Sequence, residues 1–435
     1  MDKKRIVVIG GGAGGLELVR KLGTYFSAKD TEIMLVDKNR THLWKPLLHE
    51  VAAGSLDANL DEVGYGGHGV KWGYRFFYGT FHSINRNKRL ITIAPLKDQN
   101  GEEIIKAHDI YYDYLVIATG GVSNDFSIRG VSTNALFLEQ RAHADEFRAK
   151  LLNECFKVSL QVDSGHKDAH VDVVIVGGGA TGVELAAELY NAAKSLKNYG
   201  LEDFDESRLR VSLIEAGQRI LPSLPEKLAS TAKKELSLMG VTIHTSTVVS
   251  EVGKTQITTS DGRKINSSLT LWAAGVKGAD YLSELDGLET DKLSRLVVDE
   301  FLQTSLDERI SAIGDCASFI PKTADRPLHP RAQAAHQMAK AVFVNLCAKI
   351  EKKPLQEFIY KDNGSIVSLS RFFTIGSLMG NLIRGDMAIE GRLARVAYWS
   401  LYRLHLLAIH GLLRGLTLIL IGHVNRIVRP KLKVH

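Results

Sequence analysis

Cysteine is scarce in this chain of 435 residues, which contains only three. Cys155, Cys316 and Cys347 are far apart, and none belongs to a Cys-x-x-Cys pair. This scarcity excludes a disulfide framework and a zinc ribbon, and it favours the reducing, cytosolic side of a cell. We therefore expect no metal site.

A secretory signal is also missing from the start of the sequence. The basic N-terminus is followed by an apolar run of only four residues before the first glycines. The apolar core of a signal peptide needs about 7–15 residues, so we expect residues 5–9 to form a first strand instead.

Asp and Glu are absent from residues 391–435, which carry eight Lys or Arg side chains. Without these eight charges the formal net charge of +6 becomes −2, so the basicity belongs to the tail. A helix over 391–410 would carry one mainly basic stripe, formed by Arg392, Arg395, Trp399, Arg403, Leu406 and His410. The stripe predicts an amphipathic helix lying on an anionic phospholipid surface, with packing against the protein core as the alternative for part of it. The alternating Leu, Ile and aromatic residues favour lipid over nucleic acid.

A long apolar run without charge is lacking too. Residues 404–424 are mostly apolar, but Arg414 falls near their centre. A central Arg costs about 2.5–3.5 kcal/mol on insertion scales, so surface attachment is favoured over a membrane span. Because no bundle of spanning helices is indicated, we expect no proton pumping.

What the sequence does contain is a dinucleotide motif near its start. An apolar run over residues 5–9 leads into Gly10-x-Gly12-x-x-Gly15 and a helical segment. Gly10 permits a tight turn, Gly12 lets the backbone approach a pyrophosphate, and Gly15 allows close packing of strand and helix. Asp37 ends the next apolar run and suits a ribose hydroxyl.

The same pattern occurs a second time. Residues 171–176 lead into Gly177-x-Gly179-x-x-Gly182, and the following apolar run ends at Glu215. An acid at this place favours NADH over NADPH, although Arg219 leaves NADPH open. Two dinucleotide sites in one chain imply an electron path between two cofactors.

Three local patterns predict further elements. Residues 137–153 have helical spacing and are followed by a polar loop over 161–170. Residues 255–265 form a hairpin around Asp261-Gly262. Pro330 suits the first turn of a long helix.

The order of the motifs resembles the two-dinucleotide-domain flavoproteins, the pyridine nucleotide–disulfide oxidoreductase-like superfamily. The ordered features are the first glycine motif, Ala118-Thr119-Gly120, the second glycine motif and Gly314-Asp315. The resemblance implies an α/β fold with two Rossmann-like domains for FAD and NADH, the second inserted in the first, plus a C-terminal membrane-associating helical region. The implied boundaries are 1–125 and 292–345 for the FAD domain, 126–291 for the NADH domain and 346–435 for the C-terminal region.

Within that superfamily, three segments look like type II NADH:quinone oxidoreductases. They are residues 43–52, 182–189 and 332–337. No cysteine follows Asp37 in the stretch where the disulfide and peroxide-reducing branches need one. The resemblance implies a respiratory-chain enzyme, peripheral on the cytoplasmic face of the inner membrane, that transfers hydride from NADH to FAD and then reduces quinone to quinol.

The motifs and the resemblance together name the candidate site residues. Glu184, Gln333 and His336 are the candidate catalytic residues, and Lys45, Pro46, Gln333 and Gln337 are assigned to the quinone. The cofactor-binding set is Gly10, Gly12, Ala13, Gly14, Gly15, Asp37, Lys38, Thr119, Gly120 and Asp315, with Gly177, Gly179, Thr181, Gly182, Glu215 and Gly275 in the second unit. Glu184 can also be an ordinary first-turn carboxylate, and the amides and His336 an exposed helix face. His42 and His49 are expected to be structural.

Two other functions fit parts of the pattern. A soluble NADH-dependent flavoprotein reductase of a protein acceptor such as ferredoxin would share the two cofactors but would not need the apolar tail. A redox-sensing binding protein would hold NADH and flavin without turnover. A homodimer is compatible with all three functions.

Overall fold

The structure is a computed structural model that describes residues 3–26, 30–98, 100–196, 201, 204–369, 373–380 and 383–428. It contains two compact units. Unit 1 consists of residues 1–43, 62–122 and 276–361, and unit 2 of residues 44–61, 123–275 and 362–435. Residues 123–275 thus come between two segments of unit 1. The boundaries implied at 125/126, 291/292 and 345/346 stay predictions beside this division.

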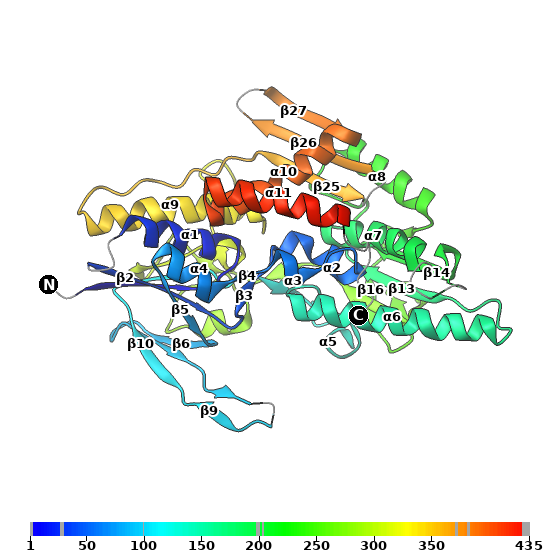
Figure 1. Ribbon diagram of the computed structural model, residues 1–435, viewed down its shortest axis with the longest axis horizontal. Coiled ribbons are helices and arrows are strands. Elements are labelled where there is room, and N and C mark those ends of the chain that lie inside the picture. Colours follow the sequence, from blue (N-terminus) through cyan, green and yellow to red (C-terminus); the bar gives the residue numbers. More distant parts are fainter. Residues whose placement is uncertain are drawn as a thin grey trace. The chain divides into compact units, whose positions relative to one another are not determined.

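A six-stranded sheet forms the centre of unit 1 (Figure 1). Its order is β22 (Gln303–Thr304), β23 (Asp307–Ala312), β11 (Tyr114–Ile117), β1 (Lys4–Ile9), β2 (Thr31–Asp37) and β5 (Arg75–Tyr78), all parallel except the edge strand β22. Strands β1 and β2 are apolar and buried on both faces, as parallel strands between helices are. The main helices are α1 (Ala13–Tyr25), α4 (Tyr65–Trp72) and α9 (Ala332–Ile350), and α1 packs on α9.

Smaller elements complete unit 1. They are β3 (Thr41–His42), β4 (Val63–Gly64), β6 (Phe81–Asn85), β7 (Leu90–Ile93), β8 (Leu96–Lys97), β9 (Glu103–Ile105), β10 (His108–Tyr111), β20 (Val276–Lys277), η4 (Asp280–Glu284), β21 (Leu296–Val297), η5 (Gly314–Cys316) and β24 (Ala317–Ser318). The chain passes from unit 1 to unit 2 at β12 (Val122–Ser123). Pro330 precedes the N-cap Arg331 of α9, so its prediction as a first-turn residue was wrong by two positions.

A four-stranded parallel sheet forms the centre of unit 2. Its order is β15 (Thr242–His244), β14 (Leu209–Ile214), β13 (Val171–Val176) and β19 (Leu269–Trp272). Its longer helices are α6 (Arg141–Asp163), α7 (Ala180–Leu196) and α8 (Glu226–Met239). The remaining elements are η1 (Lys45–Leu47), α2 (Leu48–Ala53), α3 (Ala58–Asp61), α5 (Val131–Asn134), η3 (Glu206–Arg208), β16 (Val249–Val252), β17 (Gln256–Thr259) and β18 (Lys264–Asn266). Strands β17 and β18 are antiparallel and confirm the predicted hairpin.

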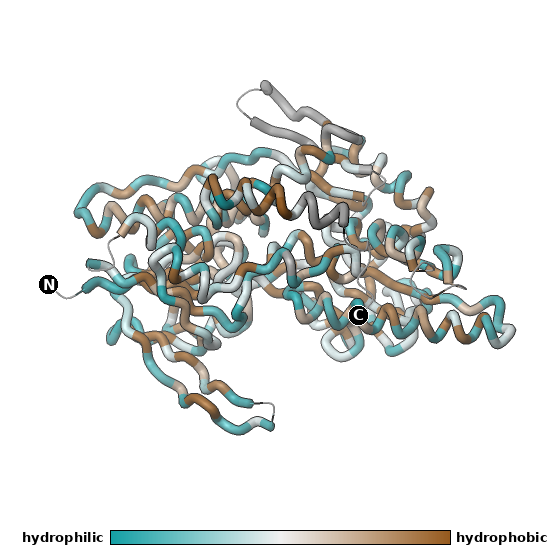
Figure 2. Tube along the Cα trace, in the orientation of Figure 1, coloured by the Kyte–Doolittle hydropathy of each residue, from teal (hydrophilic) through white to brown (hydrophobic). Residues whose placement is uncertain are grey.

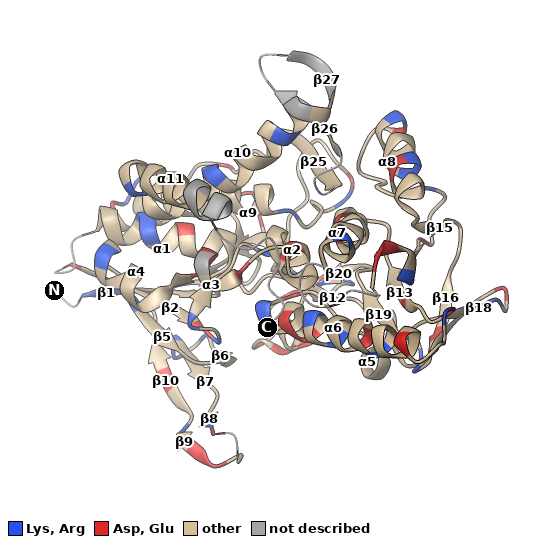
Figure 3. Ribbon diagram, turned by 45° about the vertical axis from the view of Figure 1, so that its right-hand side comes forward, with Lys and Arg blue, Asp and Glu red and all other residues tan. Residues whose placement is uncertain are grey.

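Helix α6 was predicted, but with the wrong bounds. It begins at Arg141 and continues to Asp163, so the predicted loop over 161–170 starts only after Asp163. Acidic and basic residues alternate along α6 (Figure 3), and pairs such as Arg141 with Asp145 and Glu146 with Lys150 lie one turn apart. The second half continues with the pair Glu154 and Lys157, 3.3 Å apart, and charged residues of this kind add no apolar periodicity, which is why the pattern missed this half.

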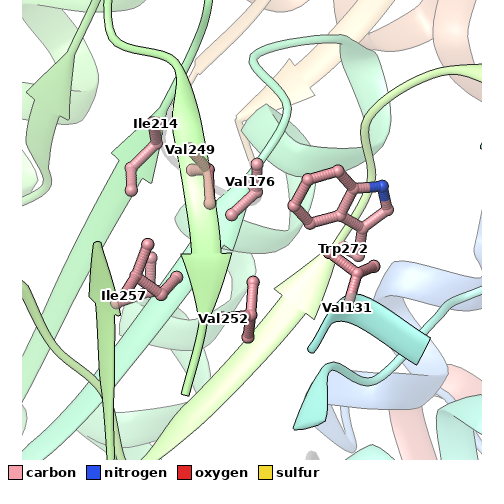
Figure 4. Packing of buried hydrophobic residues seen from close by; sticks show 8 residues of the cluster. Val131, Val176, Ile214, Val249, Val252, Ile257 and Trp272 are labelled. Carbon is pink, nitrogen blue, oxygen red and sulfur yellow. The ribbon is translucent and has the colours of Figure 1, made fainter. Parts of the chain in front are cut away.

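The core of unit 2 supports the carboxyl ends of its parallel strands (Figure 4). Val176, Ile214 and Trp272 end β13, β14 and β19, and they pack with side chains of the small antiparallel sheet and α5, namely Val249, Val252, Ile257 and Val131. The indole N–H of Trp272 donates to the carbonyl of Asn124 at 2.8 Å. This core fixes the sheet edge from which the second glycine motif emerges.

The C-terminal segment of unit 2 begins with three antiparallel strands, β25 (Gly364–Leu369), β26 (Phe373–Gly380) and β27 (Ile383–Glu390). Two helices follow, α10 (Gly391–His410) and α11 (Leu412–Val428). The predicted helix over 391–410 is confirmed. Gly411 has a φ of +73° and separates the two helices, so residues 404–424 do not form one continuous helix.

Candidate functional site

The first glycine turn (Gly10–Gly15) has the geometry of a pyrophosphate site. Gly10 has a φ of +98°, and a Cβ at Gly15 would lie 1.9 Å from the carbonyl oxygen of Gly10. A Cβ at Gly12 would meet no atom within 4 Å, so the turn is open on that side. Gly12 is the N-cap of α1, which begins at Ala13, so the turn leads directly into a helix N-terminus of the kind that binds phosphate. These residues fit a dinucleotide phosphate.

Asp37 at the end of β2 is bound to this turn. Its carboxylate accepts the backbone N–H of Gly11 at 2.6 Å and that of Asn39 at 2.7 Å. Burial raises the pKa of Asp37 in spite of these hydrogen bonds. The neighbouring Lys38 is exposed. The placement of Asp37 is what a ribose-binding acid requires.

Two side chains that the motif does not contain support the first glycine turn. The Tyr65 hydroxyl donates to the carbonyl of Gly11 at 2.8 Å, and His42 Nδ1 lies 2.9 Å from the same oxygen. The pairing of β3 with β4 brings both residues to the turn. His42 therefore has the structural role expected of it. Tyr65 lies 54 residues from Gly11 in the chain, and nothing in its local pattern indicated this contact.

Other predicted residues of unit 1 gather around the same turn. A Cβ at Gly10 would lie 2.4 Å from the carbonyl oxygen of Ala118, which precedes Thr119 and Gly120. A Cβ at Gly14 would lie 2.9 Å from the carbonyl oxygen of Ala335 in α9. Asp315 lies in η5, and its Cβ is 3.1 Å from the position of a Cβ at Gly121. The structure thus brings these segments together, while their binding of FAD stays a prediction.

The second glycine turn (Gly177–Gly182) repeats the first. Gly177 has a φ of +118°, and a Cβ at Gly182 would lie 2.1 Å from the carbonyl oxygen of Gly177. A Cβ at Gly179 would meet no atom within 4 Å. Thr181 lies in the first turn of α7. Gly275, with a φ of +69°, follows β19.

Glu215 is the counterpart of Asp37. Its carboxylate accepts the N–H of Gly178 and that of Gly217, each at 2.7 Å. Arg219 donates to the carbonyls of Leu224 and Pro222, each at 3.0 Å, so its own loop holds the guanidinium. This arrangement favours NADH, because a 2′-phosphate would meet the carboxylate and Arg219 has other partners.

Glu184 is buried in α7, with only 7% of its surface exposed. The backbone N–H of Ser368 in β25 donates to its carboxyl group at 3.1 Å, and His49 Nδ1 of α2 lies 3.6 Å away. Burial, together with the negative charges of Glu50 and Glu188, raises the pKa of Glu184 to about 8 against the opposing effect of the Ser368 hydrogen bond. Burial also lowers the pKa of His49 to about 4. Both side chains are therefore neutral at pH 7.

The candidate residues of α9 each contact another element of unit 1. His336 Nδ1 is hydrogen bonded to the carboxylate of Glu17 in α1. The Tyr360 hydroxyl donates to Gln333 at 3.2 Å, and the Gln337 side chain pairs with the backbone of Lys361 at 2.7 and 2.9 Å. Ser368 in unit 2 and Glu17 in unit 1 are contacts that the sequence reasoning missed.

Lys45 and Pro46 lie exposed in η1. They belong to unit 2, whereas Gln333 and Gln337 belong to unit 1. The grouping of these four residues around a quinone stays a prediction. Among the residues that the structure describes, no cluster of His, Cys, Asp and Glu side chains could hold a metal ion.

The C-terminal helices combine packing with exposed apolar surface. In α10, His405 stacks on Trp44 with ring centroids 3.9 Å apart, and the Tyr402 hydroxyl donates to Asp61 at 2.9 Å. Leu406 is buried, so part of the predicted stripe faces the protein. Arg392 lacks a described side chain, and Arg429, Lys431 and Lys433 lie outside the described residues.

Helix α11 is strongly apolar over its first half (Figure 2). Its exposed apolar residues are Leu412, Leu413, Leu416, Leu418, Leu420 and Ile421, with exposures of 38 to 83%. In the described part of the chain, no helix is both long enough and apolar enough to span a bilayer.

Comparison with known proteins places this geometry in a family. Residues 4–339 match the family model described as pyridine nucleotide-disulphide oxidoreductase. The type II NADH:quinone oxidoreductase of Haemophilus influenzae is 43% identical over 444 residues, covering 99% of this chain and 100% of the relative. That of Staphylococcus aureus is 30% identical over 394 residues, covering 89% and 92%.

A solved structure shares the fold over the full length. NDH2 from Plasmodium falciparum in complex with NADH has a TM-score of 0.82 at 21% identity, covering 99% of this chain and 100% of that one. Given the family model and these two relatives, this chain belongs to the type II NADH:quinone oxidoreductases of the pyridine nucleotide-disulphide oxidoreductase family.

Proposed function

We propose that this chain is a peripheral membrane enzyme that oxidises NADH at the second glycine turn and reduces quinone beside α9. The reaction of its family is NADH + H⁺ + quinone → NAD⁺ + quinol, with FAD and NADH as cofactors. FAD supplies the two-electron chemistry between the two substrates. The observation that carries the proposal is the repeated nucleotide geometry, an open glycine turn with a carboxylate bound to its backbone, present in both units.

We assign Glu184 to the nicotinamide side of this reaction. It lies five residues after Gly179, on the helix that the second glycine turn begins. Because it is protonated at pH 7, its carboxylic acid can donate a hydrogen bond without placing negative charge beside a departing hydride.

We assign Gln333 and His336 to the quinone side. Both lie in the first turns of α9, and the carbonyl of the intervening Ala335 approaches Gly14 of the first glycine turn. A histidine can pass a proton to a quinone oxygen near neutral pH, and an amide can hydrogen bond to the other carbonyl. Lys45, Pro46 and Gln337 complete the proposed quinone set.

The exposed apolar face of α11 supports attachment to a membrane surface. Leu412, Leu416 and Leu420 recur one turn apart and are 52 to 68% exposed. An anionic phospholipid surface would cover these residues and attract the basic tail. We propose the cytoplasmic face of the inner membrane as its location, and the low cysteine content supports the reducing side of that membrane. A homodimer stays a prediction.

An anaerobic titration tests the redox path. NADH is added to the flavin-loaded protein while the oxidised-flavin absorption is followed, and a short-chain quinone is then added. We expect bleaching followed by rapid recovery. Bleaching without recovery would contradict quinone reduction and indicate a protein acceptor such as ferredoxin, and no bleaching would indicate a binding protein.

Vesicle flotation tests the membrane surface. The triple change Leu412→Ser, Leu416→Ser and Leu420→Ser should weaken binding to anionic phospholipid vesicles at least about a hundredfold, because each buried leucine contributes about 1.5–3 kcal/mol. Leu238→Ser on α8 removes a leucine that is 72% exposed and serves as the control. Unchanged flotation of the triple variant would exclude α11 as the attachment site.

A further inference from the structure

The first glycine motif carries a buried glutamate that matches Glu184 of the second. Glu17 follows Gly15 by two residues, just as Glu184 follows Gly182 by two. Glu17 is only 6% exposed. A buried carboxylate is rare unless its charge is paired, so its partners indicate what it does.

Two basic side chains contact the Glu17 carboxylate. One oxygen is bound to Nδ1 of His336 in α9, and the other lies 2.7 Å from Nζ of Lys21, one turn further along α1. Arg20 is a third charged group whose field reaches Glu17. Burial alone would raise the pKa of Glu17, but the hydrogen bonds and charges of His336 and Lys21 outweigh burial and hold that pKa below its usual value.

An ionised carboxylate can only accept hydrogen bonds, so the contact with Glu17 decides the tautomer of His336. Nδ1 must carry the hydrogen in this pair, and Nε2 is then the ring nitrogen that gains or loses a proton. The side chain of His336 is 24% exposed, so the imidazole lies between the buried carboxylate and the protein surface.

We propose that Glu17 is the positioning residue of His336: it holds the hydrogen on Nδ1 and orients the ring, so that Nε2 takes up a proton from water and delivers it to the quinone. This inference rests on the proposed role of His336. Quinone reduction takes two electrons and two protons; NADH supplies the electrons and one proton, and water supplies the other. Nε2 passes one proton to a quinone oxygen and then takes up another proton from water. The overall reaction is therefore the same as that of the family.

A second hydrogen bond between the same two helices provides a matched control. The Tyr25 hydroxyl at the end of α1 donates to Glu351 at the end of α9 at 2.6 Å. If Glu17 only held α1 against α9, then removing the Tyr25 contact would have similar consequences. Tyr25→Phe cuts this link without touching His336.

The test compares two electron acceptors. Ferricyanide takes electrons from the reduced enzyme without protons, whereas a short-chain quinone needs both. We expect Glu17→Met to lower kcat with quinone at least about tenfold, with little change in KM for quinone and an unchanged ferricyanide rate, because an assisting proton donor is lost. Glu17→Gln keeps the shape of the side chain and should lower kcat with quinone less than Glu17→Met does. Tyr25→Phe should leave the rates with both acceptors unchanged.

The tautomer itself is read from the unaltered protein. In ¹⁵N-histidine NMR, with His336 assigned by its absence in His336→Gln, the neutral ring should show hydrogen on Nδ1. Hydrogen on Nε2 would overturn the inference, even if Glu17→Met failed to fold. Equal losses with both acceptors would also overturn it, because they indicate a structural role.

The variant His336→Gln separates the inference from the proposed function. If it leaves quinone turnover unchanged, then the assigned role of His336 fails and the inference fails with it. If His336→Gln is slow but Glu17→Met is not, then only the role of Glu17 fails.

Discussion

Glu17 and Glu184 occupy the same place in two copies of one motif, yet their carboxyl groups have opposite protonation at pH 7. Both are buried and each lies beside a histidine, His336 in one unit and His49 in the other. Burial raises the pKa of both, but at Glu17 the basic partners prevail and the pKa falls below the usual value, whereas at Glu184 it rises to about 8. The glycine motif therefore fixes where the carboxyl group lies and not its charge.

Burial and the histidine partner of Glu17 are the larger causes of this difference, and the residue one helical turn further adds to it. Lys21 follows Glu17 by four positions and forms an ion pair with it. Glu188 follows Glu184 by four positions and adds negative charge. Residues at this spacing are neighbours on a helix, so one side chain favours the ionised form and the other the neutral form.

The two turns also differ in their support. Tyr65 and His42 contact the carbonyl of Gly11. The corresponding carbonyl of Gly178 accepts the backbone N–H of Leu221 at 2.7 Å. Side chains thus hold the turn that is predicted to bind FAD, while a backbone N–H group holds the turn that is predicted to bind NADH.

The largest effect is expected from adding a methyl group at the third glycine of each turn. Gly182→Ala should abolish bleaching by NADH while FAD stays bound, and Gly15→Ala should prevent FAD from being retained, because each Cβ would overlap a carbonyl oxygen. Flavin content and anaerobic bleaching measure the two outcomes. Gly67→Ala in α4, where a Cβ meets no atom within 4 Å, is the control. Normal bleaching of the Gly182→Ala variant by NADH would show that NADH does not bind at the second glycine turn.

A smaller effect is expected at the acid that ends β14. Glu215→Ala removes the acceptor for two backbone N–H groups, and a hydrogen bond to a charged group contributes about 1.5–3 kcal/mol. We expect the KM for NADH to rise at least about tenfold. The ratio of kcat/KM for NADH to kcat/KM for NADPH should decrease, as measured by steady-state kinetics with both nucleotides. Asp205→Ala removes another backbone-bound acid of unit 2 and should change neither. If the variant kept the full preference for NADH over NADPH, then residues other than Glu215 would distinguish the two nucleotides.

The pH dependence of stability tests the neutral Glu184. The raised pKa contributes stability that is complete below about pH 4.5 and is lost as the pH rises towards about 8. The lowered pKa of His49 acts in the opposite direction, because the stability that it contributes is present above pH 6.5 and is lost as the pH falls towards about 4. Of these two groups, Glu184 is the one that changes the stability between pH 6.5 and 8, and its contribution to the free energy of unfolding should fall by about 2 kcal/mol. Denaturant titrations of Glu184→Gln should lack this fall, and an equal fall would show that another group titrates.

The smallest effect concerns the neighbour at Glu188. Glu188→Gln removes one of the negative charges near Glu184 and should lower the pKa of Glu184 by less than about one unit, because burial remains the larger cause. The pH at which stability stops falling should move down accordingly. Glu226→Gln on the exposed surface of α8 is the matched control. An upward movement would contradict the role given to Glu188.

The sequence predicted the parts of the site that lie within short motifs. Both glycine turns, Asp37, Glu215 and the helix that carries His336 follow local rules of turn and strand. The contacts of Tyr65 with Gly11, Ser368 with Glu184 and Glu17 with His336 join residues 54, 184 and 319 positions apart. Such pairings depend on strand and helix packing, which a single sequence does not encode in its periodicity. Helix α10 shows the same limit, because its stripe of basic residues did not reveal that His405 would stack on Trp44.

Unit 2 is assembled from three separate stretches of chain, and one of them, residues 362–435, follows the other two after the last segment of unit 1. The backbone N–H that contacts Glu184 belongs to Ser368. During synthesis the second dinucleotide sheet is complete long before that residue leaves the ribosome, and domains generally fold as units in the order in which they emerge. The newly made chain thus passes through a stage in which the nucleotide fold exists but the acid lacks its final surroundings. The contact between Ser368 and Glu184 therefore forms after the glycine turn has closed.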